Sequence, residues 1–120
     1  MSIERVLVVD DSPTDLHLIT GYLRKHGYQA LAATNGADAI STAKSERPDL
    51  ILMDIVMPEM NGFEATRTLS RDPDTAQIPV VMVSSKSQET DKIWSMRQGA
   101  ADYLVKPVTE NMLIKKIKMF

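Results

Sequence analysis

The sequence predicts an α/β fold in which about five parallel strands form one sheet. Short apolar runs alternate with amphipathic stretches along the chain, and several of the runs are rich in β-branched residues. The runs are continuously apolar, which is typical of parallel strands that are covered on both faces. The stretches between them carry apolar residues three or four positions apart, which is the spacing of a helix.

Five apolar runs are the predicted strands. Their short length and the turn residues around them favour buried strands over helices. In chain order they are residues 6–9, 30–33, 50–53, 80–83 and 103–105, of which 30–33 is the weakest.

A helix is expected after each strand. Ser12 and Pro13 suit the start of a helix, with Ser12 as its cap, and Gly27 and Gly99 suit helix ends. The predicted helical stripes are, in order, Leu16, Ile19 and Leu23; Ala37, Ile40 and Ala43; Phe63, Thr66 and Leu69; Ile93, Met96 and Arg97; and Met112, Leu113, Lys116 and Ile117.

Length and composition indicate one ordinary globular domain. The chain has 120 residues, 43% apolar and 25% charged, so residues 1–120 are expected to form a single domain with no output domain attached. A net charge of −2 argues against binding to nucleic acid, and Lys115, Lys116 and Lys118 are interpreted as a solvated last helical turn. The lack of cysteine excludes disulfides and thiolate metal sites. No apolar run could span a membrane, and we expect a cytoplasmic protein.

Polar side chains follow four of the predicted strands. Asp10 and Asp11 follow the first, Asp54 the third, Ser84 the fourth and Lys106 the fifth. The carboxyl ends of parallel strands lie at one edge of the sheet, where such folds bind ligands. Each residue alone has a plainer interpretation, such as a helix cap for the acids or a loop hydroxyl for the serine. Their joint placement predicts a functional site.

The residue types at this edge suit phosphoryl chemistry. Three neighbouring carboxylates repel one another, so a hard cation such as Mg²⁺ is expected among them. Asp54 is then a plausible nucleophile, because carboxylates form aspartyl-phosphate intermediates. Lys106 is expected to neutralise charge on the phosphoryl oxygens, and Ser84 to donate a hydrogen bond to them.

Four segments resemble the bacterial response-regulator receiver domain. They are VLVVDDS at 6–12, DLILMDIVMPEMNG at 49–62, VVMVSS at 80–85 and GAADYLVKPV at 99–108. The resemblance implies a flavodoxin-like doubly wound sheet in the order 2-1-3-4-5 with five helices. It also implies that Asp54 is the phosphoacceptor, and that Asp10, Asp11, Asp54 and the backbone carbonyl of Val56 hold Mg²⁺. No other cofactor is implied.

The resemblance further implies a switch and partners. Ser84 matches the switch hydroxyl and Tyr103 the aromatic that turns inward with it, while Lys106 matches the family's lysine and is expected to precede a cis Pro107. A histidine kinase or phosphotransfer domain would supply the phosphoryl group. A downstream protein would bind the face made by the fourth helix, fifth strand and fifth helix, and Trp94 is expected in that fourth helix.

Two positions depart from the best-known chemotaxis receivers. Val56, two residues after Asp54, is apolar, and Lys86, two residues after Ser84, is basic. Both are expected to flank the path of an attacking water, and an apolar group cannot orient that water by hydrogen bonding. The chain is therefore expected to dephosphorylate itself slowly. The fifth helix is also about one turn short. A monomer is expected, since nothing in the sequence requires an oligomer.

The function expected is that of a single-domain response regulator rather than a conventional enzyme. The chain is similar to single-domain regulators of chemotaxis-like pathways that control twitching by type IV pili. Three alternatives stay open: a phosphate sink for a shared kinase, a flavodoxin-like carrier and an aspartyl-phosphate phosphatase. The flavin carrier is disfavoured by the acidic first loop and by only 5% aromatic residues, and the phosphatase by the apolar Val56.

Overall fold

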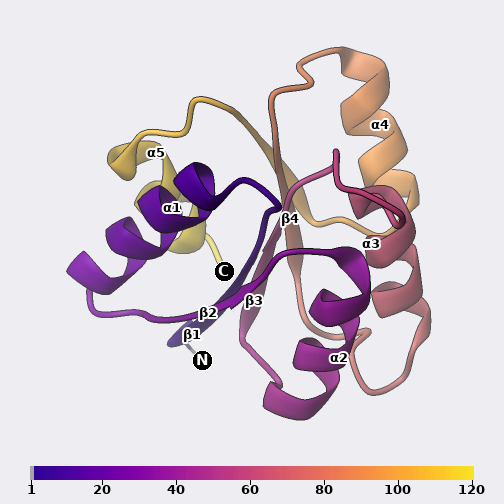
Figure 1. Cartoon of the computed structure of the whole chain (residues 1–120), viewed down its shortest axis with the longest axis horizontal. Coiled ribbons are helices and arrows are strands. Elements are labelled where there is room, and N and C mark those ends of the chain that lie inside the picture. Colours follow the sequence, from indigo (N-terminus) through magenta and orange to yellow (C-terminus); the bar gives the residue numbers. More distant parts are fainter. Residues whose placement is uncertain (1) are drawn as a thin grey trace.

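The computed structural model describes residues 2–120, and it shows five strands alternating with five helices (Figure 1). Every predicted strand and helix is present. The elements are β1 (Arg5–Val9), α1 (Pro13–Lys25), β2 (Gln29–Ala33), α2 (Gly36–Glu46), β3 (Leu50–Met53), α3 (Gly62–Arg71), β4 (Val80–Ser84), α4 (Glu89–Arg97), β5 (Asp102–Val105) and α5 (Glu110–Ile117).

The sheet confirms the predicted order and direction of the strands. Its order is β2-β1-β3-β4-β5, and all four neighbouring pairs are parallel. The strands β1, β3 and β4 therefore lie inside the sheet, while β2 and β5 are its two edges. The strand β5 pairs with β4 over a short register that places Tyr103 opposite Met82 and Val105 opposite Ser84.

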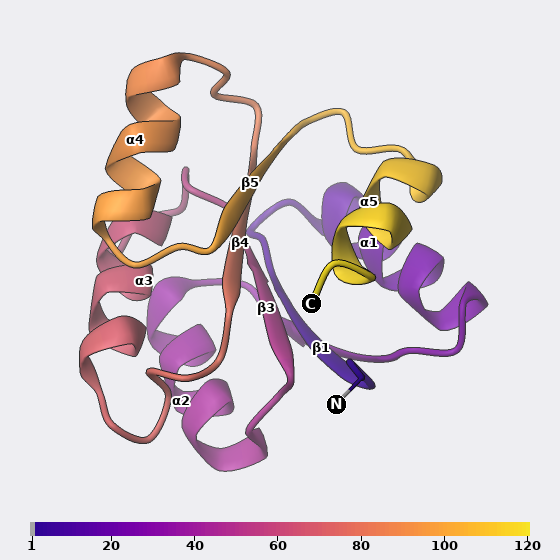
Figure 2. The same ribbon diagram turned by 180° about the vertical axis from the view of Figure 1, so that it is seen from behind.

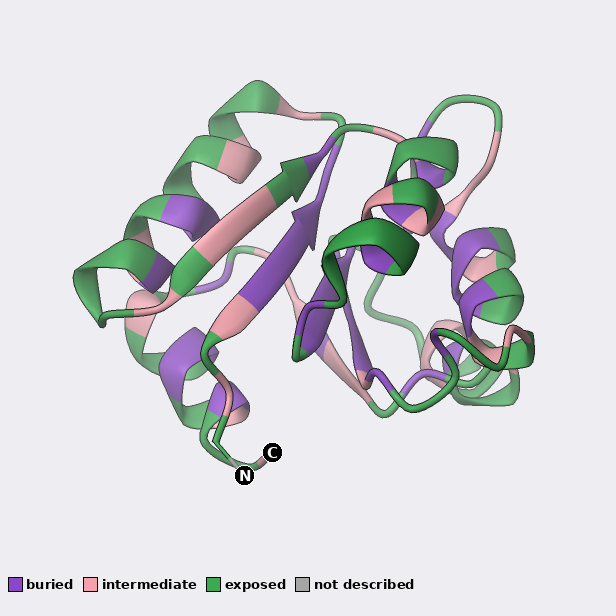
Figure 3. Cartoon of the chain, turned by 90° about the horizontal axis from the view of Figure 1, so that it is seen from below, coloured by how far each residue is buried: buried purple, intermediate pink, exposed green. Residues whose placement is uncertain are grey.

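Alternate residues of the strands pack into two separate hydrophobic cores, one on each face of the sheet. Leu7 and Val9 of β1 point to one face, where α2, α3 and α4 lie, whereas Val6 and Val8 point to the other face, where α1 and α5 lie (Figure 2). Every residue of β3 and β4 is buried, and the helices expose their outer sides (Figure 3). Burial on both faces explains why the central strands read as unbroken apolar runs.

Helix ends follow the chemistry of their residues. The hydroxyl of Ser12 accepts a hydrogen bond from the N–H of Asp15, so Ser12 is the cap of α1 as predicted. Asn35, Asn61 and Thr109 cap α2, α3 and α5 in the same way. No helix among the described residues is long and apolar enough to cross a membrane.

Two details of the predicted helices α2 and α5 were wrong. Ala37 is exposed, and Ala39 is the buried residue beside Ala43 on α2. In a helix with several alanines, spacing alone does not show which of them faces the sheet. Lys116 lies in the last turn of α5 as expected, yet it is partly buried and its ammonium pairs with Asp102 at 2.7 Å.

The helix α4 departs most from prediction. The stripe of Ile93 and Met96 does not face the core, since both side chains are about half exposed and Ser95 is the buried residue of this helix. Ile93 and Met96 are therefore left at the surface of α4 rather than in the core.

Candidate functional site

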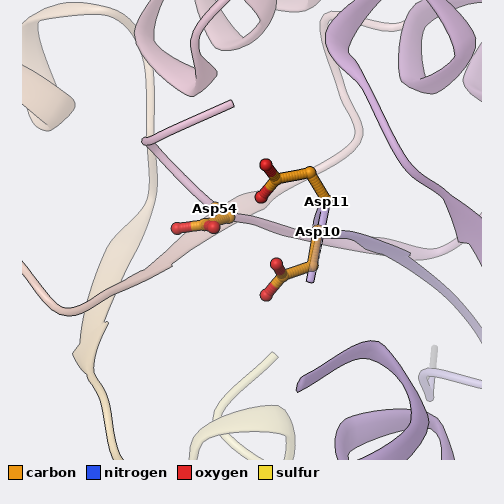
Figure 4. A group of neighbouring side chains, drawn as sticks. All are labelled: Asp10, Asp11 and Asp54. Atoms are coloured by element: carbon orange, nitrogen blue, oxygen red, sulfur yellow. The ribbon is translucent and has the colours of Figure 1, made fainter. Parts of the chain in front are cut away.

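Three carboxylates meet at the carboxyl edge of the sheet, as the sequence predicted. Asp10 and Asp11 follow β1, and Asp54 follows β3, its neighbour in the sheet (Figure 4). One oxygen from each lies within 4.8 Å of the others. Asp10 and Asp54 are buried whereas Asp11 is exposed, so the cluster has a closed floor and an open side. Oxygen ligands at this spacing form a site for one hard cation.

The surroundings of Asp54 disfavour its ionised form. Burial, followed by repulsion from Asp10, raises the pKa of the Asp54 carboxyl from 3.8 to about 6, although Lys106 acts in the opposite direction. The Oδ1 atom of Asp54 accepts a hydrogen bond from the backbone N–H of Ile55 at 2.8 Å, which fixes the orientation of the carboxylate. A dication beside this carboxyl would relieve the repulsion that raises its pKa.

Lys106 completes the cluster from the other side. Its ammonium donates to Asp10 at 2.8 Å and to Asp15 at 2.9 Å, and it lies 3.5 Å from Asp54. Burial opposes the charged form of Lys106, but these carboxylates outweigh burial and raise its pKa. Lys106 is therefore a fixed positive charge beside Asp54. The peptide bond from Lys106 to Pro107 is cis, as predicted.

Asp15 is a contributor that the sequence did not reveal. It lies in the first turn of α1 rather than at a strand end, so the search of strand ends missed it. The sequence did offer one indication of Asp15. It stands two residues after Pro13, in the first turn of α1, and α1 begins at the same edge of the sheet as Asp10 and Asp11. Asp10 also accepts a hydrogen bond from the N–H of Ser12 at 2.9 Å, so it both supports this turn and faces Lys106.

Ser84 and Tyr103 are linked through the loop after β4. The Ser84 side chain is fully buried, and its hydroxyl accepts a hydrogen bond from the N–H of Lys86 at 3.3 Å. The hydroxyl of Tyr103 donates to the carbonyl of Lys86 at 2.7 Å. One loop residue thus contacts both predicted switch residues. The side chain of Lys86 itself is exposed.

Gly62 lets the backbone pack closely against Asp54. Its N–H donates to the carbonyl of Ile55 at 2.8 Å, and a Cβ at this position would lie 2.0 Å from the carbonyl oxygen of Asp54. Only glycine fits there. Val56 lies in the intervening loop, two residues after Asp54, and is 57% exposed, so the residue at this position offers solvent an apolar group.

A family model for the response regulator receiver domain matches residues 6–118. The chain belongs to this family. It is therefore a signalling domain rather than a conventional enzyme, and a histidine kinase or phosphotransfer domain is the class of partner that the family implies.

Named relatives agree with this assignment. The receiver is 57% identical over 113 residues to Protein PilH of Pseudomonas aeruginosa, covering 94% of this chain and 93% of that protein. It is 37% identical over 114 residues to the response regulator PleD of Caulobacter vibrioides, which covers 95% of this chain but only 25% of PleD.

Solved receiver structures share the fold. The chemotaxis protein CheY4 of Vibrio cholerae superposes with a TM-score of 0.93 at 29% identity, covering 98% of both chains. The receiver domain of the sensor histidine kinase PA1611 of Pseudomonas aeruginosa gives a TM-score of 0.90 at 27% identity, covering 98% of this chain and 97% of that one. That structure holds a magnesium ion in its active-site cleft. The three carboxylates of the present chain form a donor set that fits the same ion.

Proposed function

We propose that this receiver accepts a phosphoryl group from a phosphohistidine partner onto Asp54, with Mg²⁺ held by Asp10, Asp11, Asp54 and the carbonyl of Val56. The observation that carries the proposal is the meeting of three carboxylates and one partly buried ammonium at the carboxyl edge of the sheet. The ion, when bound, supplies charge neutralisation for the carboxylates and the phosphoryl oxygens.

The side chains divide the work of phosphoryl transfer between them. An Asp54 oxygen attacks phosphorus, the bond from phosphorus to the donor nitrogen breaks, and the donor imidazole keeps the electron pair and takes a proton. The N–H of Ile55 orients the nucleophile. Lys106, held by Asp10 and Asp15, presents a fixed positive charge to the transferred oxygens.

The added charge is the signal. An aspartyl phosphate carries additional negative charge and strong acceptor oxygens, which attract a nearby hydroxyl. Ser84 supplies that hydroxyl, and its movement would shift the loop whose Lys86 carbonyl holds Tyr103. The switch thereby biases the face formed by α4, β5 and α5, where Ile93, Met96 and Met112 are already exposed. This face is the proposed docking surface for the downstream protein.

The pathway proposed is control of type IV pilus twitching by a chemotaxis-like system. The support is the similarity over almost the full length of Protein PilH. A receiver that only drains phosphoryl groups from a shared kinase would use the same site, so the pathway proposal is separate from the chemistry at Asp54.

Intact mass spectrometry tests the chemistry. The chain is incubated with Mg²⁺ and acetyl phosphate, and Asp54→Asn is treated in parallel. We expect the mass to rise by one phosphoryl group in the wild type, only with Mg²⁺, and not in the variant. Absence of any gain under fast sampling, together with no binding of beryllofluoride, would refute the proposal.

A further inference from the structure

A cavity of about 300 Å³ lies between α3 and α4, away from the acidic cluster. Its lining comes from the C-terminal halves of the two helices and the residues just after α4, and Figure 2 shows these helices side by side. Because α3 starts next to Asp54 and has ten residues, its last residue lies about 14 Å further along the helix. The lining residues are Arg67, Ser70, Arg71, Trp94, Arg97, Gln98 and Gly99.

Helical spacing directs these side chains toward one another. Arg67, Ser70 and Arg71 are separated by three and four positions on α3. Trp94 and Arg97 are three apart on α4, and Gln98 follows at its end. Residues three and four apart share one face of a helix. The cavity is therefore the meeting of two helix faces rather than a gap between unrelated loops.

Three exposed arginines line this cavity. Among residues 2–120, no ion pair involves Arg67, Arg71 or Arg97. The helix dipole accounts for basic residues in the last turns, where Arg71 and Arg97 lie. It does not account for Arg67, one turn earlier, or for the presence of all three arginines along one cavity. Arginine clusters of this kind bind phosphate groups through forked hydrogen bonds.

Trp94 supplies a planar apolar surface at the same cavity. Its side chain is 48% exposed, although an indole gains more from burial than almost any other side chain. A tryptophan beside arginines offers a stacking platform for a nucleobase next to contacts for phosphate. The cavity volume is also at the lower end of the range for small-molecule sites.

The base of the cavity is held in place before any ligand arrives. The Ser70 hydroxyl donates to the carbonyl of Gln98 at 2.9 Å, which ties α3 to the end of α4. Gly99 has a φ of +104°, and a Cβ there would lie 2.6 Å from the Cβ of Ser70. This close packing fixes how far apart the two helices lie, and a preformed site loses less free energy on binding.

We propose that the α3–α4 cavity binds a nucleotide, with its phosphates on Arg67, Arg71 and Arg97 and its base stacked on Trp94. The proposal does not rest on phosphoryl transfer at Asp54. It can therefore be tested without Mg²⁺ or a phosphodonor.

Tryptophan fluorescence reports on this cavity directly, because Trp94 is the chain's one tryptophan. The full chain in EDTA is titrated with GTP and ATP, with free N-acetyltryptophanamide correcting for absorbance. We expect saturable quenching by one or both nucleotides, with a Kd below about 1 mM. Arg67→Gln and Arg97→Gln should each weaken binding by about tenfold. Arg24→Gln, an exposed change on α1, is the matched control and should leave binding unchanged.

Three further probes separate the parts of the ligand. Guanosine lacks phosphate and pyrophosphate lacks the base, so each should bind more weakly than the corresponding nucleotide. Trp94→Ala, followed by equilibrium dialysis, should also weaken nucleotide binding. The proposal is overturned if neither nucleotide gives saturable quenching, if the arginine variants bind as the wild type does, or if pyrophosphate or a polyglutamate peptide binds more tightly than both nucleotides.

Discussion

Replacing Asp54 with Asn should stabilise the metal-free protein at neutral and alkaline pH. Burial and the neighbouring Asp10 raise the pKa of Asp54 from 3.8 to about 6, so the folded state holds this proton more tightly than the unfolded state does. The wild type is then most stable, relative to the variant, below about pH 4. Its relative stability falls as the pH rises toward about 6 and stays low above it.

The gap between the two pKa values sets the size of the effect. A gap from 3.8 to about 6 corresponds to at most about 3 kcal/mol of unfolding free energy. Asn removes the charge but keeps an oxygen for the N–H of Ile55. Lys106 keeps its bonds to Asp10 and Asp15. The expected gain from Asp54→Asn is therefore about 1–3 kcal/mol at about pH 8 and close to zero at about pH 4.

Urea unfolding in EDTA, repeated across this pH range, measures the difference. Asp74→Asn is the matched control, because Asp74 is an exposed aspartate in the loop between α3 and β4, outside the acidic cluster. The wild type could instead prove as stable as Asp54→Asn at about pH 8, or the difference in unfolding free energy could stay constant with pH. Either result would show that burial and Asp10 do not raise the pKa of Asp54.

Three other perturbations follow from the same geometry. Mg²⁺ at about one hundred times its Kd should raise the wild-type unfolding free energy by about 2.7 kcal/mol and that of Asp54→Asn by less; equal gains would place the ion elsewhere. Val56→Asn should shorten the lifetime of the aspartyl phosphate, measured by intact mass over time, because an amide can orient the attacking water where the exposed valine cannot; an unchanged lifetime would contradict this. Gly62→Ala should destabilise the fold by about 1–3 kcal/mol and reduce phosphorylation, because its Cβ would meet the Asp54 carbonyl; Gly36→Ala, which meets only the flexible Met60 side chain, is the milder control in thermal unfolding.

The meeting of the acids with Lys106 could be predicted from the sequence because each of these residues follows the end of a strand. Parallel strands place their carboxyl ends at one edge, so Asp10, Asp54 and Lys106 could be brought together without knowing any distance. Asp15 could not be found in this way, because its position depends on where α1 starts relative to the sheet. Which face of α4 packs on the sheet could not be predicted from spacing either, since Ile93 and Met96 have helical spacing but face outward.

The acids and Tyr103 lie on strands of different protection, the acids after interior strands and Tyr103 on an edge strand. The acids follow β1 and β3, strands that are hydrogen-bonded on both sides, so their positions are fixed by the most protected part of the backbone. Tyr103 lies instead on β5, which has one neighbouring strand. Edge strands open locally at a lower free-energy cost than central strands, and amide hydrogen exchange detects such local opening. If Tyr103 acts as the proposed switch, its strand β5 can therefore open locally while β1 and β3, which position the acids, stay closed.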